Sequence, residues 1–67
     1  YMHLTFTIDN ITYSKFVKDE EMRKIYLGIN EIIKAKLDGG NIEYIGTDGK
    51  KTVFKASEIQ AIGIEFD

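Results

Sequence analysis

The segment from Gly46 to Thr52, GTDGKKT, is the part of the chain most similar to a phosphate-binding loop. A loop of the Walker type needs four residues between its glycines and a helix after its lysine, so that free backbone N–H groups point at the anion. Here two residues separate Gly46 from Gly49, and the residues that follow, VFKA, favour a strand. We therefore predict a structural turn, with Lys50 and Lys51 as solvated charges near its tip.

Nucleophilic or acid–base catalysis requires a base that is held against a nucleophile by a third group. His3 is the only histidine, and strand alternation places it on the face opposite Leu4 and Phe6, so we expect its ring in solvent. Ser14 is expected to point outward from a strand, and Ser57 to begin a helical turn. The carboxylates follow neither the spacing of an EF-hand nor that of a glycosidase pair. The sequence predicts no catalytic residue, no metal site and no cofactor, and we expect a protein that is not an enzyme.

Lysines and aromatic residues alternate along the expected strands, which raises single-stranded nucleic-acid binding as an alternative function. Base stacking on a sheet requires exposed rings. The four strand aromatics instead share their alternation with isoleucines, and we expect them in the core: Phe6, Tyr13, Tyr44 and Phe54. A net charge of −2 gives no general attraction to nucleic acid. If the alternative holds, the basic surface consists of Lys50, Lys51 and Lys55.

The length of the chain predicts one small domain that spans residues 1–67. Its composition, 43% hydrophobic and 30% charged, argues against disorder. There is no cysteine, so a disulfide or a cysteine-based zinc site cannot stabilise the domain. No apolar run approaches the roughly 20 residues that span a bilayer, and no signal-peptide pattern is present. We expect a cytoplasmic protein without a membrane segment, and Met2 as its native initiator.

Residues 4–16 alternate apolar and polar on both sides of Asp9-Asn10, a pair that tolerates the positive φ of a two-residue hairpin turn. This turn would set Ile8 opposite Ile11 and Phe6 opposite Tyr13. Threonine and serine then fall together on the other face, as expected when one side of the hairpin is packed and the other is wet.

From Asp19 to Asp38 the hydrophobic period becomes that of a helix. Asp19 is the expected N-cap, and Gly39 the left-handed stop. Seven apolar side chains fall within an arc roughly 140° wide that we expect to pack on a sheet: Met22, Ile25, Tyr26, Ile29, Ile32, Ile33 and Leu37. Gly28 lies within the helix, where it costs roughly 1 kcal/mol relative to alanine, so we expect another element to approach closely there.

The remaining residues predict three strands. NIEYIG and KKTVFKA flank Thr47-Asp48-Gly49, and two registers are open. A two-residue turn sets Tyr44 opposite Val53, whereas a three-residue loop with Gly49 left-handed sets Ile42 opposite Phe54. We prefer the second because it separates the apolar side chains better. Ser57-Glu58-Ile59-Gln60 has the form of a capping box, and the last strand carries Ile62, Ile64 and Phe66 on one side.

The predicted fold is therefore α+β, in the order ββαβββ, with one helix on a curved antiparallel sheet. Such a layout leaves apolar side chains without cover, unless curvature closes the sheet toward a small barrel. Our hypothesis is a small regulatory or interaction module that binds a protein partner or a second copy of itself, through a sheet face or an edge strand. Inhibitors encoded by bacteria and their viruses are a class of this size. The expected contact residues are Ile45, Val53, Leu27 and Phe16.

Overall fold

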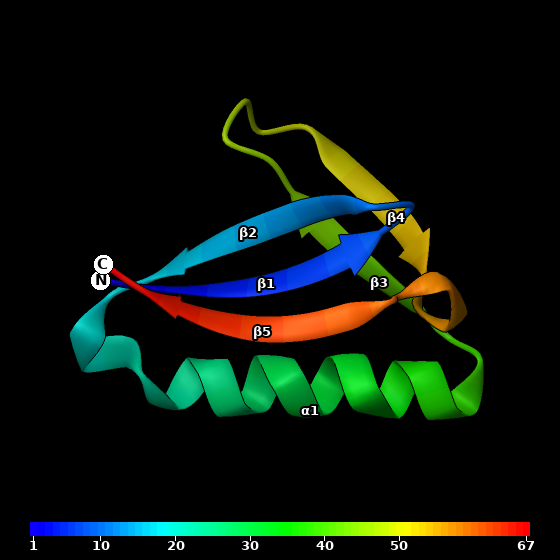
Figure 1. The fold of residues 1–67 in the computed structure, drawn as a ribbon, viewed down its shortest axis with the longest axis horizontal. Coiled ribbons are helices and arrows are strands. Elements are labelled where there is room, and N and C mark those ends of the chain that lie inside the picture. The colour runs from blue at the N-terminus through cyan, green and yellow to red at the C-terminus, as the bar shows by residue number, and fades with distance from the viewer.

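The computed structural model describes all residues from 1 to 67 and contains one α-helix, five strands and two short 3-10 turns (Figure 1). Their bounds are β1 Met2–Ile8, β2 Ile11–Val17, η1 Asp19–Glu21, α1 Arg23–Asp38, β3 Asn41–Ile45, β4 Lys51–Lys55, η2 Ala56–Glu58 and β5 Ala61–Phe66. This order confirms a small α+β domain with one helix packed on antiparallel strands. The strands form two separate sheets, one in the order β2-β1-β5 and one of β3 and β4.

The first hairpin has the predicted register. Ile8 pairs with Ile11 and Phe6 with Tyr13, and both Asp9 and Asn10 have positive φ, 52° and 63°. A two-residue turn of this kind fixes the register of the strands that it joins, because the turn leaves only one way to align them. Strand β5 then pairs antiparallel with β1 along its other edge, with Phe6 opposite Ile62.

The helix ends as predicted and begins later than predicted. Gly39 is left-handed at φ 72°, and its N–H bonds the carbonyl of Ala35. At the other end, residues 19–21 form the 3-10 turn η1, and the N-cap of α1 is Met22, with no side-chain hydrogen bond. The prediction that Asp19 caps the helix is wrong, because this carboxylate lies outside α1 and contacts the amino group of Tyr1 at 3.2 Å.

The second hairpin has the register of the three-residue loop. Ile42 pairs with Phe54 and Tyr44 with Thr52, while Gly49 has φ 79°. The segment GTDGKKT is thus a hairpin turn. The single helical turn after β4 is present as η2, but Lys55 precedes it and no side chain caps it. The predicted capping role of Ser57 is therefore wrong.

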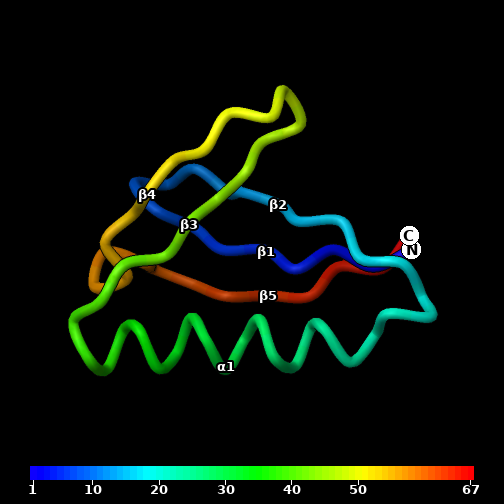
Figure 2. Tube along the Cα trace, turned by 180° about the vertical axis from the view of Figure 1, so that it is seen from behind, coloured from blue at the N-terminus to red at the C-terminus, as the bar shows by residue number.

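The core lies on one face of the β2-β1-β5 sheet, where both α1 and the β3–β4 hairpin cover it (Figures 1 and 2). The larger buried cluster joins β1, α1 and η2: Leu4, Phe6, Ile8, Ile32, Ala56 and Ile59. A smaller cluster of Met2, Val17 and Ile25 lies near the start of the helix. Ile29 packs against both clusters. The four strand aromatics lie between the hairpin and the β2-β1-β5 sheet and pack on one another.

Leu4 of β1 packs directly against α1 at Gly28. A Cβ atom built there would lie 2.8 Å from Cδ2 of Leu4, a buried side chain. The expected close approach is confirmed, and the approaching group is a side chain of β1.

We expect Gly28→Ala to destabilise the domain by about 1 kcal/mol, because displacing Leu4 costs about 1–3 kcal/mol and the gain in helix propensity returns about 1 kcal/mol. Asn30→Ala, at an exposed helical position, is the control and should be neutral or slightly stabilising. Urea unfolding followed by circular dichroism measures both variants. A stabilised Gly28→Ala would show that Leu4 moves aside at no cost.

Candidate interaction surfaces

The four residues predicted to contact a partner are all exposed but do not form one surface. Ile45 and Val53 expose 67% and 57% of their area on the outer side of the β3–β4 hairpin, and Leu27 exposes 63% on α1. Phe16 lies on the outer face of the other sheet, because its strand partner is His3. The outer faces of the two sheets are therefore separate surfaces.

Phe16 and Ile45 do share one shallow groove. The groove has a volume of about 520 Å³, lies between β2 and the end of β3, and is also lined by His3, Ser14 and Tyr44. Tyr44 crosses it, since its hydroxyl donates to the Ser14 carbonyl at 3.0 Å. Only three of the nine residues that line the groove are hydrophobic, so it offers few apolar side chains to a partner.

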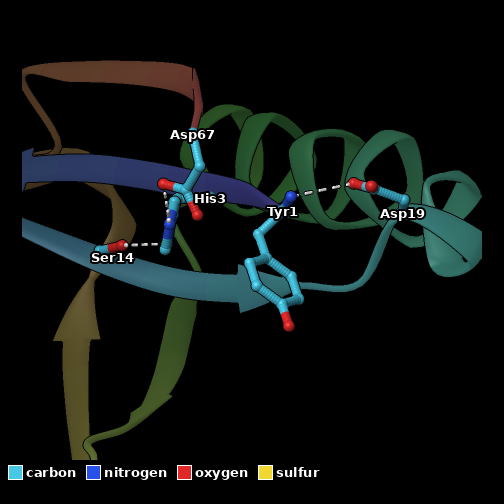
Figure 3. Close-up of polar contacts among 5 residues, drawn as sticks. All are labelled: Tyr1, His3, Ser14, Asp19 and Asp67. Carbon is cyan, nitrogen blue, oxygen red and sulfur yellow. Dashed lines mark hydrogen bonds and ion pairs between the residues drawn. The ribbon is translucent and has the colours of Figure 1, made fainter.

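A polar trio crosses the outer face of the β2-β1-β5 sheet (Figure 3). His3 Nε2 lies 3.1 Å from Asp67 Oδ1, and His3 Nδ1 lies 3.3 Å from Ser14 Oγ. A carboxylate only accepts, so Nε2–H donates to Asp67, and Nδ1 of the neutral ring accepts from the Ser14 hydroxyl. The ring also packs edge-on against Phe16. The His3 ring, which we expected in solvent, has 26% of its side-chain area exposed, and two neighbours in the fold hold it.

The trio contains the residue types of a nucleophile, a base and an orienting acid. Acyl transfer also needs preorganised donors for an oxyanion and a site from which water is excluded. Ser14 is exposed, and the Asp67 side chain exposes 55% of its area. We therefore interpret the trio as a polar tie between β2, β1 and the end of β5.

The basic residues of the alternative function lie along the second hairpin. Lys51 pairs with Glu43 across the strands at 3.0 Å, and Lys50 and Lys55 are exposed. The aromatic rings between which bases would stack are packed on one another, with Phe6 in contact with Tyr13 at 5.2 Å and with Tyr44 at 5.6 Å between ring centroids. No exposed row of rings accompanies the lysines.

A further exposed apolar area lies on α1, at residues that we predicted to be buried. Ile25 and Ile32 are buried under the sheet. Four members of the predicted buried arc remain exposed by 47%, 64%, 43% and 81%: Met22, Tyr26, Ile33 and Leu37. At 100° per residue these four occupy an arc only about 60° wide, next to the buried ridge.

The exposed arc lies on the β5 side of the helix. Gly28, Glu31 and Ile32, on the opposite flank, line a cavity of about 500 Å³ with Ile42 and Tyr44 of β3. The other flank is consequently turned away from the hairpin, toward the side on which Figures 1 and 2 draw β5.

Strand β5 extends this apolar surface. Ile64 and Phe66 pair with Leu4 and Met2, so their side chains lie on the sheet face that carries α1. They are exposed by 38% and 74%. We call the six exposed side chains together the α1–β5 strip, which comprises Met22, Tyr26, Ile33, Leu37, Ile64 and Phe66.

No group of three or more His, Asp or Glu side chains is placed to hold a metal ion, and every buried side-chain polar atom has a hydrogen-bond partner. No helix is long and apolar enough to cross a bilayer. Comparisons of this chain with protein-family models, with curated proteins and with solved structures find no match.

Proposed function

We propose that this domain is a small interaction module that binds a protein partner through the α1–β5 strip. One observation carries the proposal: the chain exposes 5078 Å², whereas a folded monomer of 7.7 kDa is expected to expose about 4,300 Å². The excess, roughly 750 Å² over the whole surface, indicates a fold that leaves more area uncovered than is usual for its size.

The composition of the strip also supports protein binding. Its six side chains are aliphatic, aromatic or methionine, types that are enriched in the centres of protein interfaces, where charged residues are depleted. The surface residues named from the sequence do not combine in this way, because Ile45 and Val53 lie on the hairpin and Leu27 on the far flank of the helix.

The salt dependence of oligonucleotide affinity distinguishes protein binding from single-stranded nucleic-acid binding. A surface built from Lys50, Lys51 and Lys55 would bind oligonucleotides with an affinity that falls steeply as salt rises. The mutual packing of the four strand aromatics favours the protein-binding function, because none of these four rings is exposed for bases to stack on.

Site-specific photo-crosslinking in cells tests the proposal whatever the identity of the partner. A photoreactive phenylalanine analogue at Tyr26 or Phe66 is expected to give a discrete covalent adduct. The same analogue at Leu27, which is exposed by 63% against 64% for Tyr26, is the matched control and should give none. Adducts at Leu27 and Val53 but not at Tyr26 or Phe66 would contradict the proposed surface.

A further inference from the structure

We infer that the partner is a second copy of this chain, which pairs with the first through β5 and forms a six-stranded sheet in the order β2-β1-β5-β5-β1-β2. This inference rests on the proposed function, since it assigns the occupant of the same strip. Three features of β5 and α1 carry it: an unpaired strand edge, an unprotected sequence on that edge, and an apolar helix flank beside it.

Strand β5 pairs with β1 only, so its other edge is free. The N–H of Asp67 donates to the carbonyl of Tyr1 at 3.2 Å, which places the odd-numbered residues of β5 in the hydrogen-bonded pairs with β1. Because antiparallel pairs alternate, the N–H and C=O groups of Ile62, Ile64 and Phe66 point out of the free edge. The strand therefore presents a regular row of backbone donors and acceptors.

The free edge has few of the features that prevent pairing, since Glu65 is its one charged residue. Proteins protect edge strands with lysine, proline, bulges or a covering element. Strand β4 carries Lys51 and Lys55, and on β2 the carbonyl of Ser14 accepts the hydroxyl of Tyr44. Strand β5, AIGIEF, has neither lysine nor proline.

Because Ile62, Ile64 and Phe66 all point their backbone groups out of the free edge, two copies of β5 can pair antiparallel about a two-fold axis at Ile64. Ile64 then lies opposite its own copy and Ile62 opposite Phe66, and each pair exchanges backbone hydrogen bonds. Glu65 falls opposite Gly63, so no two carboxylates oppose each other across the new pair. The strand is thus compatible with itself in charge and in hydrogen bonding.

The same two-fold axis also covers the exposed flank of α1. Both α1 helices lie on one face of the joined sheet and run antiparallel, with their exposed flanks turned toward each other. A single added peptide strand would form hydrogen bonds with the free N–H and C=O groups of β5, but it would leave Tyr26, Ile33 and Leu37 exposed to water. A second copy covers the strand edge and the helix flank together.

Sedimentation equilibrium of the intact chain between 10 and 100 µM, concentrations of order those at which weak dimers form, tests the inference. We expect a dimer, of twice the 7.7 kDa chain mass. Tyr26→Glu and Phe66→Glu should each raise the dimer Kd at least about 30-fold, as loss of an interface hot spot does. Leu27→Glu and Val53→Glu introduce the same charge at similarly exposed positions and should leave Kd unchanged.

Amide hydrogen exchange separates strand pairing from helix contact alone. The N–H groups of Ile62, Ile64 and Phe66 should be protected at high protein concentration and exchange rapidly on dilution, whereas that of Gly63 should stay protected at both. A monomer at 100 µM, or a dimer in which these three amides exchange freely, overturns the inference. A monomer whose Tyr26 crosslinker still captures a foreign protein overturns it while the proposed function stands.

Discussion

Replacing Phe6 with alanine is expected to lower the free energy of unfolding by about 3–5 kcal/mol. Phe6 is 5% exposed and is the ring that joins the two sheets, because it stacks on Tyr13 of β2 and meets Tyr44 and Phe54 of the hairpin edge-on. A domain of this size gains only about 3–5 kcal/mol from its core. The variant should therefore be largely unfolded at 25 °C.

Phe16→Ala is the matched control for Phe6→Ala. It removes the same side chain from β2, where the ring is 49% exposed and meets only Tyr1 and His3, and it should cost at most about 1 kcal/mol. Urea unfolding at one fixed protein concentration measures both, since association would add a concentration-dependent term. A similar loss in the two variants would show that the hairpin is not anchored through Phe6.

The second large effect is expected at Ile25, which is 1% exposed and is the most deeply buried large side chain of the helix. Ile25→Ala removes its contacts with Met2 and Val17, and should destabilise the domain by about 2–5 kcal/mol because a cavity remains between helix and sheet. Thermal unfolding followed by circular dichroism should show a correspondingly lower midpoint.

Ile33→Ala, two helical turns further along α1, distinguishes burial in one chain from burial between two. Ile33 is 43% exposed in the single chain, so truncation should cost less than about 1 kcal/mol in a dilute sample. In a concentrated sample it should cost more, because the side chain is then part of the interface. Equal losses of unfolding free energy for Ile25→Ala and Ile33→Ala in the dilute sample would contradict a helix that buries Ile25 and exposes Ile33.

Association through the α1–β5 strip, as proposed, would add to the stability of this cysteine-free chain of 67 residues. Domains of this size commonly need a disulfide, a metal ion or self-association to supplement a small core. Only ten of the residues are buried in the single chain. Association through the strip would bury further apolar area at roughly 25 cal/mol per Å², reduced by the entropic cost of bringing two chains together.

Local chemistry was enough to predict both hairpins. The register of β1 and β2 follows from strict alternation around Asp9-Asn10, and that of β3 and β4 from the need for a left-handed residue at Gly49. Gly39 ends the helix for the same reason. Each of these features depends on residues within a few positions of one another, so the sequence determines them directly.

Only the tertiary structure decided which surfaces stay exposed. Seven apolar residues fall within one helical arc, and periodicity cannot tell which part of that arc meets the sheet. The hairpin packs beside the helix on the same face, so Ile25 and Ile32 are covered and Tyr26 and Leu37 are left beside β5. Likewise, Asp67 reaches His3 across 64 positions of sequence. Contacts between distant segments depend on how elements pack in three dimensions, which the period of a single element does not encode.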